Sequence, residues 1–387
     1  DVLAQRVTPG RIVPADATTL DRKLMVGYQG WFTAPGDGSR IAPWTHRFLY
    51  GAPKLENAVF EFWEDQSEYA PEELYDTGLL TVAGAPARLP SPANAAVARR
   101  HVRWMRDYGI DGFFQQRFAV GTFADDGSRA HNDLILANTS EAARLEGRVF
   151  AVMYDLTGVG EGRFGDHYAD HVFADWRHLV DDLGVLNGAY VHHRGAPVVA
   201  LWGLGFNAPQ YGRDPNEMLR LQALFRNAEP RYRACLFGGV PTGWRTGDGD
   251  SRADPAYQAV YAGFDVVSPW MVGRFGTGAD AANHARGRLA ADLALTRGRG
   301  QDYSAVVFPG FSWHNMQTNV NRVFGRPIPD APYNAIPRRA GTFLWDQIRE
   351  YTSAGTTMLY VAMFDEVDEG SAIFKLPASR NDVPAGW

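Results

Sequence analysis

The sequence contains a single cysteine, Cys235, among its 387 residues. One cysteine excludes an intramolecular disulfide and a metal cluster held by cysteine thiolates. No apolar run reaches the roughly eighteen residues needed to cross a bilayer, which predicts a soluble chain without a membrane span. Basic residues are outnumbered as well, since the net charge is −6 and the pI is near 5.9. This charge balance argues against a nucleic-acid partner, which would require a basic surface.

Several catalytic motifs are also missing. No Gly-x-Ser-x-Gly elbow indicates a serine hydrolase. No strand carries His-x-His, and the adjacent His192 and His193 would point to opposite faces of a strand, which disfavours a metallohydrolase with histidine ligands. The glycines of FGTGADAA (275–282) and GVGEGRFG (158–165) lack the context of a dinucleotide or phosphate site. We therefore expect no cofactor.

The most informative stretch that is present runs from Thr356 to Phe374. It begins as an apolar, β-prone segment and continues with four acids in five residues, namely Asp365, Glu366, Asp368 and Glu369. Acids crowded at the end of a buried strand raise each other's pKa, so that one keeps its proton while another is ionised. Glycosyl transfer to water requires such a pair. The competing interpretation is an acidic first turn of a helix.

The rest of the chain alternates between strand and helix patterns, with 45% hydrophobic and 13% aromatic residues. This alternation predicts one (β/α)8 TIM barrel over residues 1–387, with a polar leader at 1–23 and a long irregular insertion at 32–94. A doubly wound open sheet is the alternative. The predicted strands are Leu24–Trp31, Gly109–Phe118, Arg148–Asp155, Pro197–Gly205, Arg233–Gly239, Phe264–Arg274, Ser304–Trp313 and Thr356–Asp365. The predicted helices lie at Ala95–Tyr108, His131–Leu145, Asp170–Leu183, Pro215–Ala228, Ala256–Ala262, Asp280–Thr296 and Gly341–Thr352.

Nearly every predicted strand ends in amide, indole or carboxyl groups. A barrel gathers these ends at one mouth, where they suit a hydroxyl-rich ligand with apolar faces. The eleven tryptophans suggest stacking platforms for sugar rings. The candidate substrate-binding residues are Tyr28, Gln29, Trp31, Gln115, Gln116, Arg117, Tyr154, Asp155, Trp202, Trp270, Arg274, Trp313, His314, Asn315 and Asp365.

The run MFDEVDEGSAIF resembles the Glu-x-x-Glu-Gly signature of glycoside hydrolase family 99, and GYQGWF, DGFFQQRF and WMVGRF resemble a bacterial branch near families 99 and 71. The resemblance implies a retaining endo-α-mannosidase or endo-α-mannanase. It implies that Glu369 is the general acid/base and that Glu366 deprotonates the 2-hydroxyl to form a 1,2-anhydro sugar. Val367-Asp368 stands where the family usually has Trp-His, a departure that bears on substrate identity.

The leading hypothesis is thus a glycoside hydrolase for an α-linked oligosaccharide or polysaccharide, with mannan as the first guess. The start at Asp1 fits either removal of a signal peptide or a shortened sequence, and on the first interpretation we expect a secreted or periplasmic protein. Two alternatives stay open. One is a non-catalytic carbohydrate-binding barrel, and the other is a metal-dependent hydrolase whose acidic run binds Ca²⁺ or Mg²⁺.

Overall fold

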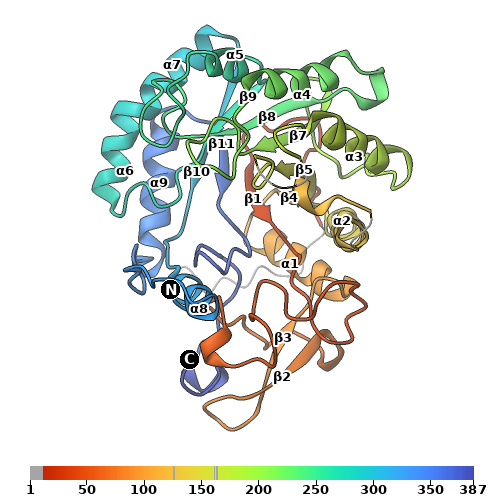
Figure 1. Cartoon of the computed structure of the whole chain (residues 1–387), viewed down its shortest axis with the longest axis vertical. Coiled ribbons are helices and arrows are strands. Elements are labelled where there is room, and N and C mark those ends of the chain that lie inside the picture. The colour runs from red at the N-terminus through yellow and green to blue at the C-terminus, as the bar shows by residue number, and fades with distance from the viewer. Residues whose placement is uncertain (1–11, 125–126, 161, 163) are drawn as a thin grey trace.

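Eight parallel strands form a closed barrel in the computed structural model, which describes residues 12–124, 127–160, 162 and 164–387 (Figure 1). The strands are β1 (Leu24–Tyr28), β4 (Gly112–Phe118), β5 (Val149–Asp155), β7 (Ala196–Trp202), β8 (Cys235–Val240), β9 (Val266–Pro269), β10 (Asp302–Val307) and β11 (Met358–Val361). Each strand pairs with the next, and β11 pairs with β1, which closes the sheet. The predicted (β/α)8 barrel is confirmed, and the open-sheet alternative is wrong.

Helices connect the strands and cover the outside of the barrel (Figure 1). They are α1 (Ala95–Asp107), α2 (Ser128–Glu146), α3 (Ala169–Asp181), α4 (Pro215–Asn227), α5 (Tyr257–Ala262), α6 (Gly278–His284), α7 (Ala290–Gly298), α8 (His314–Val323) and α9 (Thr342–Ser353). Local sequence fixes several of their ends. The Asn94 side chain accepts a hydrogen bond from the Ala96 N–H at the start of α1, and Gly147, with φ of 64°, ends α2.

Two helical segments differ from the prediction. The stretch predicted as one helix, Asp280–Thr296, contains a π-helical turn at Ala285–Leu289 between α6 and α7. No helix was predicted between Trp313 and Gly341, but residues His314–Val323 of this stretch form α8. The sequence of α8 is rich in Asn, Thr and Val, which are weak helix formers. Its buried Asn319 donates hydrogen bonds to the carbonyls of Leu55 and Ala58, so contacts with the insertion stabilise this helix.

Side chains of the barrel strands alternate between two environments, as strand geometry requires. On β4, Phe114 packs against Phe237 and Tyr360 in the barrel interior. Its neighbour Gln115 accepts a hydrogen bond from Thr139 of the outer helix α2. The side chains of consecutive residues at a strand end therefore lie on opposite sides of the sheet.

The insertion at 32–94 is more ordered than expected. It contains an antiparallel hairpin of β2 (Leu74–Leu80) and β3 (Pro86–Pro90), with a register shift between Asp76 and Leu79. The hairpin lies beside the C-terminal segment (Figure 1), where the N–H of Val82 donates to the carbonyl of Val383 at 2.9 Å. The irregular sequence around the β-bulge concealed this pairing.

Residues 1–11 of the predicted leader lie outside the described part of the chain. Residues 12–23 lie against the barrel, where the N–H of Ala15 donates to the carbonyl of Gly147 and Leu20 is buried. Across the described residues, no helix is both long and apolar enough to span a bilayer.

Candidate active site

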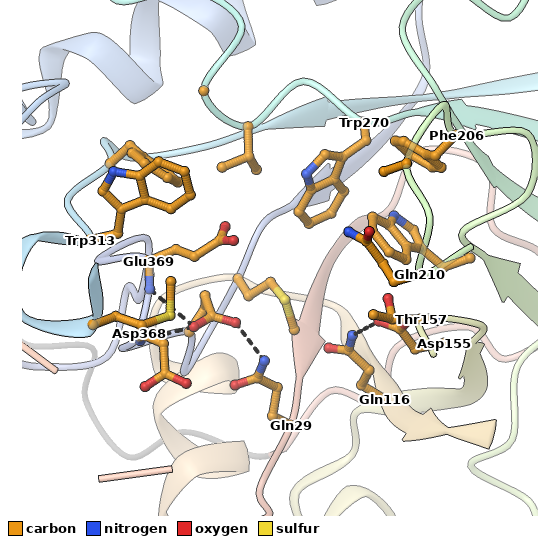
Figure 2. Close-up of a pocket in the computed structure, with 18 of the residues that line it drawn as sticks. Gln29, Gln116, Asp155, Thr157, Phe206, Gln210, Trp270, Trp313, Asp368 and Glu369 are labelled. Atoms are coloured by element: carbon orange, nitrogen blue, oxygen red, sulfur yellow. Dashed lines mark hydrogen bonds between the residues drawn. The ribbon is translucent and has the colours of Figure 1, made fainter. Parts of the chain in front are cut away.

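A cavity of about 830 Å³ opens at the carboxyl ends of the barrel strands (Figure 2). Ten of the residues predicted from the sequence line it. They are Gln29, Trp31, Gln116, Asp155, Trp202, Trp270, Arg274, Trp313, Glu366 and Glu369. The topology explains their convergence, because parallel strands of a closed barrel all end at the same mouth.

The acidic run follows β11 as a tight loop that leads into the cavity. The N–H of Phe364 donates to the carbonyl of Gly27 at 2.8 Å, which ties the start of the loop to β1. The N–H of Ala372 donates to the carbonyl of Glu366 at 2.8 Å and closes it. Gly370 has φ of 61°, and a side chain there would collide with Ser312. Glycine at this position therefore lets the loop fold against the chain after β10.

Glu366 is held by three hydrogen bonds. Its Oε2 accepts one from the side-chain amide of Gln29 at 2.6 Å, and its Oε1 accepts two from the N–H groups of Asp368 and Glu369 at 2.9 and 3.3 Å. Gln29 is itself fixed, since its N–H donates to Asp365 Oδ1 at 2.8 Å. These donors orient the Glu366 carboxyl group and favour its ionised form.

Glu369 has a different environment. Figure 2 shows its carboxyl group reaching into the cavity toward Trp270. Among the described residues, none donates a hydrogen bond to this carboxyl group, although the Glu369 carbonyl accepts one from the N–H of Ser312 at 2.8 Å. The backbone of Glu369 is therefore anchored, while its carboxyl group is left for a ligand.

Burial raises the pKa of both glutamates. The pKa of Glu366 lies well above its ordinary value, because burial is reinforced by the charges of Asp368 and Glu369. Burial raises the pKa of Glu369 to about 7, with Asp368 adding to the shift and Arg274 opposing it. Two such groups beside one cavity share a proton near neutral pH. Because both pKa values are raised, the shifts alone do not decide which group holds the shared proton. The hydrogen bonds distinguish the two groups, since Glu366 accepts three N–H donors while no described residue donates one to the Glu369 carboxyl group.

A third carboxyl group, Asp155, lies at the other end of the cavity (Figure 2). Its Oδ2 accepts a hydrogen bond from the Gln116 amide at 2.5 Å, and its Oδ1 accepts one from the N–H of Thr157 at 2.8 Å. Burial raises its pKa to about 6, against the effect of these donors. Asp155 and Gln116 thus form a fixed pair of polar groups opposite the glutamates.

Aromatic rings form the walls between these polar ends. Trp202 contacts Trp270 and Phe206, each with ring centroids 5.1 Å apart. Polar atoms of four lining residues are buried without a partner among the described residues, namely the indole nitrogens of Trp31 and Trp202, the Oε1 of Gln116 and the Oδ1 of Asp368. Apolar ring faces beside unpaired donors and acceptors suit a ligand with both C–H surfaces and hydroxyl groups.

The charges at the rim are largely paired. Arg274 forms an ion pair with Asp250 at 2.8 Å, and His46 Nδ1 lies 3.3 Å from Asp368 Oδ2. His46 also stacks on Trp31, with ring centroids 4.4 Å apart. In the part of the chain that the structure describes, no three His, Cys, Asp or Glu side chains converge as metal ligands would.

Seven predicted substrate-binding residues do not line the cavity, which corrects that assignment. Tyr28, Gln115, Arg117, Tyr154 and Asp365 are buried and do not line the cavity. Of the other two, Asn315 lines a second hollow, and His314 stacks on Tyr333 of that hollow. Tyr28 contacts His101 of α1, and both Arg117 and Tyr154 contact Asp175 of α3. Strand alternation turns each of these side chains away from the mouth.

Other lining residues were not predicted individually. Phe206, Asn207, Gln210 and Tyr211 come from the loop after β7, and Asp250 comes from the loop after β8. The first four lie within the irregular stretch Phe206–Arg213, which has a high content of aromatic and amide residues. Loop composition was the available signal for them. Asp250 follows Gly and Asp residues typical of any turn, so nothing in the sequence distinguishes it.

Known structures with the same architecture were found by comparison of the fold. An endo-α-mannosidase of glycoside hydrolase family 99 from Bacteroides thetaiotaomicron aligns with a TM-score of 0.59 and 15% identity, over 93% of this chain and 90% of that one. A structure of a family 99 endo-α-mannosidase from the same organism, in complex with bis-tris-propane, aligns with a TM-score of 0.58 and 13% identity, over 93% and 89%. No protein-family model and no curated protein matches the sequence. The resemblance drawn from the sequence is therefore confirmed at the level of the fold.

Proposed function

We propose that this protein is a glycoside hydrolase that cleaves an α-linked oligosaccharide or polysaccharide, with an α-mannan as the first substrate to test. One observation carries the proposal. The carboxyl groups of Glu366 and Glu369 line one cavity, yet the first accepts three hydrogen bonds and the second accepts none from the part of the chain that the structure describes. Such asymmetry creates one ionised and one protonated carboxyl group, as glycoside hydrolysis requires.

In the proposed reaction, Glu369 donates its proton to the glycosidic oxygen as the bond from C1 to that oxygen breaks. In an α-mannoside, where the 2-hydroxyl group is trans to the leaving group, Glu366 accepts the proton of the 2-hydroxyl group while O2 attacks C1, which gives a 1,2-anhydro sugar. A water molecule then attacks C1, its proton returns to Glu369, and O2 takes its proton back from Glu366. The two inversions retain the configuration at C1, so the product stereochemistry tests this route.

Substrate positioning is assigned to the opposite part of the cavity. Asp155 and Gln116 are placed to bind sugar hydroxyl groups, and Trp202, Trp270 and Trp313 are placed to cover ring faces. Arg274 and Trp31 extend the lining toward the rim. The family 99 enzymes that share this fold are endo-α-mannosidases, which is why α-mannosides come first and α-glucosides second. We also expect secretion or a periplasmic location, because polymeric glycans lie outside the cytoplasm.

The test is the variant Glu369→Gln with a panel of α-mannosides and α-glucosides. We expect turnover to fall at least about 100-fold, since general acid catalysis contributes that much or more, while calorimetry still detects glycan binding. Glu217→Gln is a matched control, because Glu217 is a buried glutamate on α4 outside the cavity. Full turnover by Glu369→Gln would refute the assignment.

The second candidate is a carbohydrate-binding barrel without catalysis, which the aromatic walls would serve equally well. Binding of α-glycans by the unaltered protein, with no reducing ends released over days, would favour it. Turnover that is lost after exhaustive chelation and restored by Ca²⁺ or Mg²⁺ would instead favour the metal-dependent alternative.

A further inference from the structure

A second hollow, of about 400 Å³, lies on the outer side of the chain segment that follows β10. It is bounded by Ser312 and Asn315, by Tyr333 and Asn334, and by residues of the insertion and of the C-terminal segment, including Glu61 and Trp387. Its lining residues differ from those of the catalytic cavity. Asn315, which was predicted to bind substrate, lines this hollow instead, and His314, predicted likewise, stacks on the lining residue Tyr333.

A ribbon of two extended segments separates the two hollows. The backbones of Phe311 and Ile336 exchange hydrogen bonds of 3.0 Å in each direction. Side chains alternate along the ribbon, so that Phe311 and Trp313 face the catalytic cavity while Ser312 between them faces the second hollow. The wall between the hollows is therefore one pair of segments thick.

An exposed aromatic ring lies at this hollow in a fixed orientation. Tyr333 is 61% exposed, yet its ring stacks on His314 with centroids 3.7 Å apart and an interplanar angle of 27°. The Tyr333 hydroxyl donates to Asn315 Oδ1 at 3.0 Å. The Tyr333 ring is therefore fixed although most of its surface is exposed. Such a ring is a preformed platform, because binding of a ligand costs no conformational entropy for ordering the ring.

Polar groups surround this platform. Glu61 accepts hydrogen bonds from the Ser312 hydroxyl and from the N–H of Asn315, which holds the hollow open between the insertion and the ribbon. Trp387 is fixed opposite, since its indole N–H donates to the Glu61 carbonyl at 2.9 Å. Among the described lining residues, Glu61 has the one ionisable carboxyl side chain, and no Lys or Arg is present to bind an anionic group. The lining therefore suits a neutral sugar with an apolar ring face.

We propose that this hollow is a second glycan-binding site, which holds neutral sugar residues of the same polysaccharide that the catalytic cavity cleaves, with Tyr333 as the stacking platform. The inference rests on the proposed function for the identity of the glycan. One polymer can reach both sites because a single ribbon separates them. The N–H of Ser312 also donates to the carbonyl of Glu369, so the ribbon is bonded directly to the catalytic loop.

The test uses Tyr333→Ala and Tyr333→Phe in the Glu369→Gln background, where the glycan stays intact. Migration is measured in native gels that contain α-mannan or α-1,3-glucan. We expect Tyr333→Ala to weaken retention about three- to tenfold and Tyr333→Phe to keep it, because the ring face rather than the hydroxyl makes the contact. Trp345→Ala is the matched control, since Trp345 is an aromatic residue on α9 that is 67% exposed and lines neither hollow.

A second measurement uses the active enzyme. Tyr333→Ala should raise KM for the polysaccharide several-fold and leave kcat/KM for a short α-glycoside unchanged. Retention equal to that of the parent protein in the Tyr333→Ala variant would overturn the second site even if cleavage is observed. Retention that depends on Tyr333 without any cleavage would support the second site while refuting the proposed function.

Discussion

Polar side chains that face the inside of the barrel and those that face its outside have different environments. On the inner side, Asp155 and the glutamates Glu366 and Glu369 are buried carboxyl groups whose pKa is raised. On the outer side, Arg117 of β4 and Tyr154, which precedes Asp155 on β5, bind Asp175 of α3. Burial lowers the pKa of Arg117, but the Asp175 charge outweighs it and raises the pKa overall.

This difference distinguishes the residues that stabilise the fold from the residues that take part in the proposed reaction. In a buried ion pair between a strand and an outer helix, the attraction of the two charges compensates the cost of removing them from water. Removal of one partner leaves the other charge uncompensated. A carboxyl group that faces a cavity without such a partner is costly to ionise, and it exchanges protons near neutral pH as a result. We therefore expect inward substitutions to change activity and outward substitutions to change stability.

The largest expected effect is on the inner side. Glu366→Gln should lower turnover about 100- to 10,000-fold, because the base in the proposed reaction is lost. Its free energy of unfolding should stay the same or rise, since a buried carboxyl group with a raised pKa is removed. Rates on an α-glycan and urea denaturation check both expectations. Glu366→Gln with parental turnover would show that the inner face is not catalytic.

The matching change on the outer side is Arg117→Met. It leaves Asp175 buried without its cation, so we expect the free energy of unfolding to fall by about 3–5 kcal/mol. The rate per folded molecule should change less than about twofold, because Arg117 does not line the cavity. Urea denaturation and active-site-normalised rates measure the two quantities. Loss of catalysis with unchanged stability would contradict the expectation that outward-facing residues affect stability and not activity.

A smaller contrast is available at adjacent positions of β4. Gln116→Ala removes the amide that donates to Asp155, and we expect KM to rise about tenfold, near 1.4 kcal/mol, with little change in Tm. Gln115→Ala removes hydrogen bonds to the Gln29 carbonyl and to Thr139, and we expect Tm to fall while KM is unchanged. Calorimetry measures Tm and steady-state kinetics measures KM for both variants, which compares a glutamine that faces the outer helices with a glutamine that faces the cavity.

The smallest effect is the pH dependence of stability. The pKa of Glu369 is raised from an ordinary 4.5 to about 7, so the folded protein binds more protons than the unfolded chain between these values. Stability should therefore decrease as pH rises through this window, by an amount on the order of 1–3 kcal/mol from this group. Urea denaturation at pH 4.5 and 7.5 measures the slope. Glu369→Gln should reduce this slope, because Glu366 and Asp155 still contribute to it, whereas Glu217→Gln should leave it unchanged.

Much of the fold was predictable from local patterns. All eight barrel strands were located, because strands buried on both faces are continuous apolar runs, although β9 and β10 end five and six residues earlier than predicted. The acidic run after Thr356 also indicated the cavity glutamates directly. Helix α8 and the β2–β3 hairpin were missed, since contacts with distant segments stabilise them where local propensity does not.

Within the site, the sequence identified which strand ends carry polar groups but did not assign their faces. Gln115, Gln116 and Arg117 are consecutive, and the period of two shows only that neighbours oppose each other. Which of them points inward depends on the register of the closed barrel, and that follows from packing against α2 and α3. The alternation divides the predicted strand-end residues into two sets that face opposite sides of the sheet, but it does not show which set faces the cavity.

The order of strands and helices and the paired acids after the last strand could be predicted from the sequence, because hydrophobic period and local residue chemistry are encoded in neighbouring positions. The folded barrel was needed to show that Glu366 accepts three hydrogen bonds while no described residue donates one to the Glu369 carboxyl group, and that Asn315 lines a second hollow. The physical reason is that hydrogen-bond partners and cavity walls come from segments far apart in the chain, brought together when the barrel closes.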